Sequence, residues 1–173
     1  EKFKEALIST LKVISDDYKI NENENKNLKS KNFNFLEIDN IKNKQDYNKI
    51  RAETDSEALK RKFSNNNIYQ KNSPSNSSCK LLYNISEKIR YEVLGTKMLK
   101  GISSNLKNNY SYKLLNKKKD HIKSKEDVEI AEAFELYMLK NFMEIKLDSL
   151  SEKTLSYWEK DFNNSFKNHI KYL

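Results

Sequence analysis

The amino-acid sequence predicts a mostly α-helical, single-domain protein of four to five helices. The first reason is that apolar residues recur at steps of three and four in several segments, which places them on one face of an α-helix. The second is composition, because hydrophobic residues at 36% and charged residues at 34% of the 173 suit a polar helical globule that is long enough to bury a core. The third is that the alternation typical of a β-strand occurs in only one region, near the N-terminus.

The central helix is predicted over residues 81–106, which contain both glycines of the chain, Gly95 and Gly101. Its apolar stripe consists of Leu82, Ile85, Ile89, Val93, Met98, Ile102 and Leu106. The spacing of the stripe changes near Gly95, where the step from Val93 to Met98 is five residues. A glycine inside a helix costs roughly 1 kcal/mol of stability relative to alanine. We therefore expect a kinked core helix in which either another backbone packs closely against Gly95, or the helix breaks there and restarts.

Further helices are predicted over residues 2–15, 46–63, 128–142 and 151–173. Asp46 is the expected N-cap of the second of these segments. Ser124, followed three residues later by Asp127, resembles a capping box that starts the third. Trp158, the only tryptophan, lies on the apolar face of the last helix, so we expect it to be core or docking surface.

A β-hairpin is predicted near the N-terminus, where Tyr18 and Ile20, and then Phe33 and Phe35, alternate with polar residues. The polar run 21–31 between them has the composition of a turn, and a disordered linker is the alternative. The remaining connections are expected to be irregular. The first is residues 65–78, which contain the only proline, Pro74, and whose serines offer an N-cap for the central helix. The second is the basic stretch 108–125.

No catalytic, cofactor-binding or metal-ligating residues are predicted. The spacing of Gly95 and Gly101 fits neither a phosphate-binding loop nor a nucleophile elbow. The two histidines, His121 and His169, have no partner at metal-ligand spacing, and a single cysteine, Cys79, excludes a disulfide framework and a cysteine-based zinc site within one chain. The carboxylates at 16–17 and 126–135 are interpreted as solvated helix surface rather than acid–base pairs.

The net charge of +8 favours acidic partners, although lysine is also the common surface residue of proteins from AT-rich genomes. Lysines in 97–107 and 113–125, with Tyr110 and Tyr112 nearby, could bind single-stranded nucleic acid through phosphate contacts and stacking. This is the rival hypothesis, since no known nucleic-acid motif accompanies the lysines. No apolar run approaches the roughly 18 residues of a transmembrane helix.

The central segment resembles one in the T subunit of cobaltochelatase, the CobT family. The matching positions are Glu87, Arg90, Glu92 (shifted by one), Gly95, Met98 or Leu99, Gly101, Asn105 and Leu106. Three more segments resemble that family in the same order: the opening helix, residues 51–59, and residues 126–142. A fourth segment, residues 150–162, follows, with Trp158 on the family's tryptophan. Alanines and arginines of the family are widely replaced by lysine and asparagine.

The resemblance implies a non-catalytic subunit of an ATP-dependent complex that inserts Co(II) into hydrogenobyrinic acid a,c-diamide in aerobic cobalamin synthesis. Its implied partners are an AAA+ ATPase (the S subunit), a large N subunit and further copies of itself, with ATP, Mg and Co(II) handled by the complex. The family's C-terminal integrin-like domain, with its metal-adhesion motif, and the acidic linker before it are not found. We therefore expect residues 1–173 to be the N-terminal domain alone, with a helix and possible hairpin in 1–40 and a helical core in 44–173.

The expected interaction residues are Arg90, Gly95, Lys97, Gly101 and Asn105. A broad basic face aligned with the two tyrosines would favour nucleic acid, which we consider the less favoured partner. A hydrophobic or mixed patch around the two glycines would favour protein docking. A third possibility is a scaffold domain of a chelatase-like complex reused for another task. The positive charge also suggests docking of an acidic surface, such as the family's linker, with binding that weakens as salt rises. A cytoplasmic location is expected.

Overall fold

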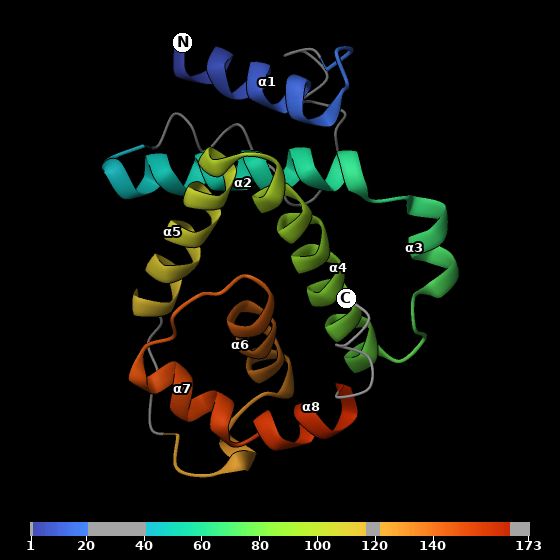
Figure 1. Ribbon diagram of the computed structural model, residues 1–173, viewed down its shortest axis with the longest axis vertical. Helices are drawn as coiled ribbons and strands as arrows, with labels where there is room; N and C mark the ends of the chain where they lie inside the picture. The colour runs from blue at the N-terminus through green and yellow to red at the C-terminus, as the bar shows by residue number, and fades with distance from the viewer. Residues whose placement is uncertain (1, 21–40, 117–121, 167–173) are drawn as a thin grey trace. The chain divides into compact units, whose positions relative to one another are not determined.

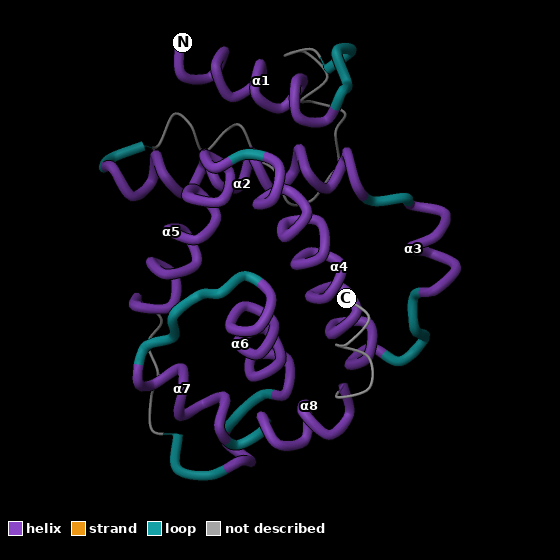
Figure 2. Tube along the Cα trace, in the orientation of Figure 1, coloured by secondary structure: helices purple, strands orange, loops and turns teal. Residues whose placement is uncertain are grey.

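The computed structural model describes residues 2–20, 41–116 and 122–166, and these ranges contain eight α-helices, one short 3-10 helix and no strand (Figure 1, Figure 2). The elements are α1 (Lys2–Ser15), α2 (Lys44–Phe63), α3 (Asn66–Asn72), α4 (Ser77–Met98), α5 (Lys100–Asn116), η3 (Lys125–Asp127), α6 (Ile130–Phe142), α7 (Ser149–Ser156) and α8 (Glu159–Phe166). The helical prediction is confirmed, whereas the count of four to five helices is wrong.

The predicted hairpin is not borne out. Tyr18 is exposed and lies in a turn after α1, and no strand occurs in the ranges that the structure describes. The second half of the prediction, Phe33 and Phe35, lies outside those ranges. The alternation that suggested a strand at Tyr18 and Ile20 comes instead from a turn in which Ile20 alone is buried.

The chain divides into two compact units. Unit 1 comprises residues 1–69 and 90–109, and unit 2 comprises residues 70–89 and 110–173. Both α4 and α5 contribute residues to each unit.

In unit 1, α1 lies side by side with α2, and the two helices run in the same direction (Figure 1). At their N-terminal ends the rings of Phe3 and Tyr47 stack with centroids 3.9 Å apart, and at their C-terminal ends Lys62 forms an ion pair with Asp16. The apolar face predicted for α1 is confirmed in part: Leu7, Leu11 and Ile14 are buried, together with Ile8, whereas Ala6 and Val13, expected beside them, are exposed. Two neighbouring parallel helices need a connection as long as a helix, which residues 16–43 provide.

The helix α2 begins two residues earlier than predicted. Its N-cap is Asn43, whose Oδ1 accepts hydrogen bonds from the backbone amides of Gln45 and Asp46. Asp46 is therefore not the cap, and its carboxylate accepts from the Lys42 amide at 3.0 Å instead. An asparagine caps as well as an aspartate, so composition alone could not rank the two positions.

The predicted central helix is two helices, α4 and α5, and the break is at Leu99 rather than at Gly95. The predicted loop 65–78 contains the helix α3, whose first amides are capped by Asn65. The cap of α4 is Asn76, which accepts from the Cys79 amide at 3.0 Å, and not a serine. The first part of the stretch predicted to be irregular, up to Asn116, belongs to α5.

In unit 2, α6 is contacted by both α7 and α8 (Figure 1). Phe134 and Tyr137 on α6 meet Phe162 on α8 with ring centroids 5.6 and 5.3 Å apart. The predicted last helix is two helices, because the chain leaves helical geometry around Tyr157 and Trp158.

The predicted capping box is confirmed, but it starts η3, and α6 begins at Ile130. Trp158 is half-buried, stacked on Phe162 and covered by Lys125, whose Nζ lies 4.0 Å from the ring centroid. The indole is thus partly core, as expected.

Candidate functional site

The junction of α4 and α5 lies over α2 within unit 1 (Figure 1), and the five residues expected to take part in interactions lie on these two helices. Three of them, Arg90, Gly95 and Asn105, make contacts that hold α4 and α5 to α2. The other two, Lys97 and Gly101, are exposed at the junction itself. The structure therefore separates residues that the sequence grouped together.

Gly95 is where α4 lies closest to α2. A Cβ atom at this position would overlap the side chain of Leu59, lying 2.9 Å from its Cγ and nearer still to both methyl carbons. Leu59 is completely buried, so it cannot move aside without disturbing the core. Neither predicted alternative is found at Gly95: the helix continues through it, and its close neighbour is the Leu59 side chain and not a backbone.

A buried polar contact joins α5 to α2. The Asn105 amide donates a hydrogen bond from Nδ2 to Oδ2 of Asp55 at 2.7 Å, and Asp55 is only 2% exposed. Burial raises the pKa of the Asp55 carboxyl above its ordinary value, while the hydrogen bond from Asn105 and the charge of Arg51 act in the opposite direction. The amide of Asn105 is thus committed to a carboxylate of its own chain.

A second buried contact joins α4 to α2. Ser56 donates from Oγ to Oε1 of Glu92 at 2.5 Å, and Glu92 is 1% exposed. Nearby, Arg90 donates from Nη2 to the carbonyl oxygen of Phe63 at 2.8 Å, which satisfies a carbonyl in the last turn of α2. Together with the contacts of Gly95 and Asn105, these bonds fix both helices on residues 55–63 of α2.

The elbow surface, which we define as Lys97, Met98, Leu99, Lys100 and Gly101, is exposed at all five positions. Met98 is 44% and Leu99 is 52% exposed, so the prediction that Met98 belongs to the apolar stripe of the core is wrong. A Cβ atom on Gly101 would meet no heavy atom within 4 Å. Two adjacent apolar side chains are thus flanked by two lysines, and next to them the backbone at Gly101 is not covered by a side chain of its own.

The sequence contained a signal for this surface that periodicity alone overlooks. Met98 and Leu99 are adjacent, so a single helix could not bury both on the same narrow stripe, and a lysine stands on each side of the pair. A lysine in the last turn is a sequence signal of a helix C-terminus, and Lys97 occupies that place in α4.

The tyrosines of the nucleic-acid hypothesis do not form one exposed face. Tyr112 is 44% exposed, but Tyr110 is 5% exposed, with Nζ of Lys88 5.2 Å from its ring centroid. A buried ring cannot stack on a base. The mixed apolar and basic elbow surface matches the criterion stated for protein docking.

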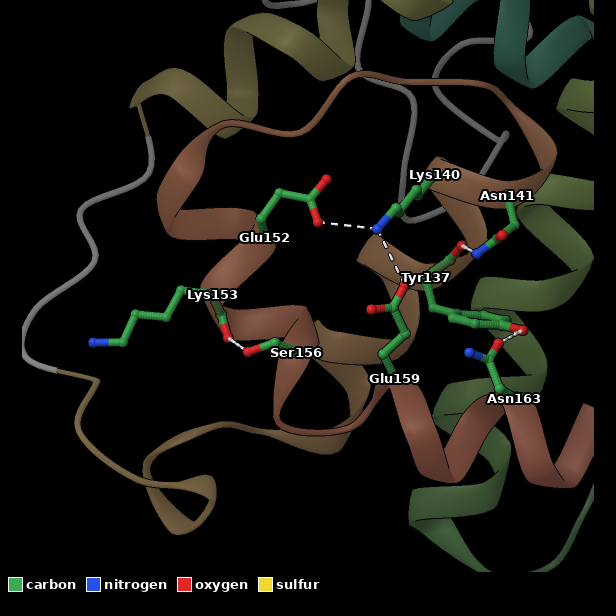
Figure 3. Close-up of polar contacts among 8 residues, drawn as sticks. All are labelled: Tyr137, Lys140, Asn141, Glu152, Lys153, Ser156, Glu159 and Asn163. Carbon is green, nitrogen blue, oxygen red and sulfur yellow. Dashed lines mark hydrogen bonds and ion pairs between the residues drawn. The ribbon is translucent and has the colours of Figure 1, made fainter.

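In unit 2 the charged groups stabilise helix positions. Figure 3 shows Lys140 of α6 between Glu152 of α7 and Glu159 of α8, at 3.0 and 3.1 Å. The hydrogen bond to Glu152 raises the pKa of Lys140 above its ordinary value, with a contribution from Glu159 and against partial desolvation, so the ammonium stays charged at neutral pH. These carboxylates are more than a third exposed, and each pair contributes about 0 to 1 kcal/mol.

The acidic cluster at the start of η3 has a capping role. Backbone hydrogen bonds from Lys123 and Ser124, together with the Ser124 hydroxyl, lower the pKa of the Asp127 carboxyl. An aspartate that is held ionised in this way is a poor general base, which agrees with the interpretation as solvated helix surface.

Within the residues described, no three or more His, Cys, Asp or Glu side chains are arranged to hold a metal ion. His121 and His169 lie outside those residues. None of the helices described combines the length and the apolar character needed to cross a membrane.

Comparison with protein families gives one match over the whole chain. The model of a family described as "Cobalamin biosynthesis protein CobT" matches residues 1–173. Comparison with curated proteins and with solved structures finds no match.

Proposed function

Because the chain belongs to the CobT family of cobalamin biosynthesis proteins, we propose that it is a non-catalytic interaction domain of an ATP-dependent cobaltochelatase. The family match over residues 1–173 is the observation that carries this proposal. In the complex, Co(II) is inserted into hydrogenobyrinic acid a,c-diamide, and this domain forms contacts with an AAA+ ATPase S subunit and with the large N subunit. The domain acts in the cytoplasm and assembles with further copies of itself.

The chemistry resides on the partners in this proposal. ATP and Mg belong to the ATPase, and Co(II) and the corrinoid belong to the large subunit, while residues 1–173 are the N-terminal domain of the T subunit and bind none of them. The elbow surface supports a role in protein contacts, because two adjacent exposed apolar side chains lie there between two lysines without an ion-pair partner among the residues described.

The experiment is size-exclusion chromatography with light scattering on this chain mixed with the S subunit, and separately with the N subunit, each with and without ATP and Mg. We expect a co-eluting complex with the S subunit, since an ATPase and its adaptor must associate to transmit work. If neither subunit co-elutes under any of these conditions, this domain is not the contact and the proposal is wrong. A scaffold in another chelatase-like complex would then be the remaining function for a member of this family.

A further inference from the structure

Gly101 is a residue that the fold does not require. It is the second residue of α5, and neither glycine of the chain has a positive φ, so no left-handed turn demands it. Its Cβ position is open, in contrast to that of Gly95. Glycine loses more conformational freedom on folding than any other residue, and it is favoured where another backbone or a ligand must approach closely. A closely approaching partner accounts for Gly101, whereas the contacts inside the domain do not.

The residues beside Gly101 define what such a partner offers. Met98 and Leu99 expose apolar surface, and Lys97 and Lys100 stand on either side of them. Among the residues that the structure describes, neither lysine has an ion-pair partner. A complementary surface therefore carries carboxylates that reach both lysines and apolar side chains between them.

The junction lies in a basic segment of the sequence, of which Lys97, Lys100 and Lys107 belong to unit 1. Between Glu92 and Asp120 the sequence contains seven lysines and no acidic residue. Those lysines account for all but one unit of the net charge of +8. A long acid-free segment produces a positive potential that no neighbouring carboxylate in the sequence cancels, and it selects acidic partners.

We propose that the elbow surface docks an acidic segment of a partner protein, with Gly101 as the point where the backbone of that segment lies against α5. Carboxylates of the segment pair with Lys97 and Lys100, and its apolar side chains cover Met98 and Leu99. The inference rests on the proposed function only for the identity of the protein that carries the segment.

Two other occupants fit less well. A second copy docked through the same surface would bring the four lysines of two elbow surfaces together, and like charges in contact repel. A nucleic acid would satisfy the lysines but would leave the apolar pair uncovered, and Tyr110 is buried and unable to stack on a base.

The test uses fluorescence anisotropy with a short labelled peptide of glutamate and leucine. We expect saturable binding that weakens at least about tenfold between 0.1 M and 1 M salt, because the screening length falls from about 10 Å to about 3 Å. A glutamate–serine peptide, a lysine–leucine peptide and an oligothymidylate are the comparison ligands. The proposal is overturned if the glutamate–leucine peptide shows no saturable binding, or if any comparison ligand binds as tightly.

Elbow variants show where the peptide binds. Lys97→Gln combined with Lys100→Gln should weaken binding about tenfold, as the loss of two exposed ion pairs predicts. The matched control, Lys2→Gln combined with Lys44→Gln, removes two exposed lysines from other helices of unit 1 and should bind like the wild type. Equal affinity of elbow and control variants would place the peptide elsewhere and overturn the assignment.

Gly101→Gln separates binding from folding. The open space at residue 101 accepts the side chain, so Tm should stay unchanged or rise by a few degrees, whereas binding should weaken about tenfold because the side chain stands between the two surfaces. Ala6→Gln, at an exposed position of α1, is the control. Undiminished peptide binding by Gly101→Gln would show that no backbone approaches there, and would overturn that part of the proposal.

The same variants mixed with the S and N subunits distinguish this inference from the proposed function. If the wild type binds a subunit and the elbow variants bind it equally well, the docking assignment fails while the proposed function stands. If the wild type binds neither subunit but binds the acidic peptide through the elbow, the proposed function fails while the docking surface stands.

Discussion

Gly95 and Gly101 are separated by five residues and have opposite surroundings. Gly95 lies against the buried side chain of Leu59, whereas Gly101 faces open space. The polar neighbours differ in the same way, because Asn105 and Glu92 are bonded to residues of α2, while Lys97 and Lys100 have no such bond among the residues described. One side of the junction holds the helices on α2, and the other is exposed. A glycine in a helix can thus indicate a contact within the fold or a contact beyond it, and only its surroundings distinguish the two.

The largest expected effect is on the packed side. Asn105→Ala should lower the free energy of unfolding by about 1.5 to 3 kcal/mol, because it leaves the buried Asp55 carboxylate without its hydrogen-bond donor. Equilibrium unfolding in urea measures this change. A loss below about 0.5 kcal/mol would show that the Asp55–Asn105 contact is not part of the fold.

The loss of stability caused by Asn105→Ala should also depend on pH, because its hydrogen-bond partner Asp55 ionises. The pKa of Asp55 is already raised by burial, and removing Asn105 removes an influence that lowers it. A carboxyl with a raised pKa in the folded state binds more protons folded than unfolded, so its contribution favours folding at acid pH and is lost as pH rises through the folded-state pKa. The destabilisation by Asn105→Ala should therefore be greater at pH 7 than at pH 4. The control is the same substitution in a chain that carries Asp55→Asn, whose side chain cannot ionise. There the destabilisation by Asn105→Ala should be the same at pH 7 and pH 4.

Gly95→Ala should destabilise the protein by about 1 to 2 kcal/mol. Overpacking against Leu59 costs about 1 to 3 kcal/mol, and the reduced entropy of the unfolded chain offsets about 0.4 to 1 kcal/mol of that. Adding Leu59→Val should recover part of the loss, because the smaller side chain makes room for the new methyl group. If the double variant loses stability additively, Leu59 is not the neighbour that excludes a Cβ atom.

Gly101→Ala should have the opposite sign. With no neighbour to meet and no positive φ, the alanine should raise the free energy of unfolding by about 0.4 to 1 kcal/mol. Thermal unfolding of the two single alanine variants, side by side, checks the difference in sign. Destabilisation by both variants would remove the distinction between the two glycines.

The smallest effect is expected for the exposed apolar pair. Met98→Ser combined with Leu99→Ser should change the free energy of unfolding by no more than about 0.5 kcal/mol, since neither side chain is buried. A loss of several kcal/mol in urea unfolding would mean that the two residues belong to the core after all.

The sequence was informative where a structural signal is local. The apolar spacing in residues 2–15 predicted α1, and Ser124 with Asp127 predicted a capping box that forms. Apolar spacing failed to show a helix boundary where two consecutive helices continue the same spacing. The spacing of Leu155, Trp158 and Phe162 continues through the break between α7 and α8, so the break is invisible to the pattern.

Two features depend on contacts between residues far apart in the sequence. One is the position of the break between α4 and α5, and the other is which residues of the junction contact α2. Gly95 was the expected break, but packing against Leu59 keeps it inside α4. Asn105 was expected to contact a partner, but its actual partner, Asp55, is 50 residues away in the sequence. No periodicity or motif connects such positions, and therefore the sequence could not show which residues of this segment contact α2 and which are exposed.

Backbone hydrogen exchange in the presence of the AAA+ S subunit, ATP and Mg tests the central claim most directly. Slowed exchange of the amides in residues 97–101, with little change in residues 90–95, is the predicted result. Unchanged exchange at 97–101 while other parts of the domain become protected would contradict the claim that the open side of the junction is the docking surface.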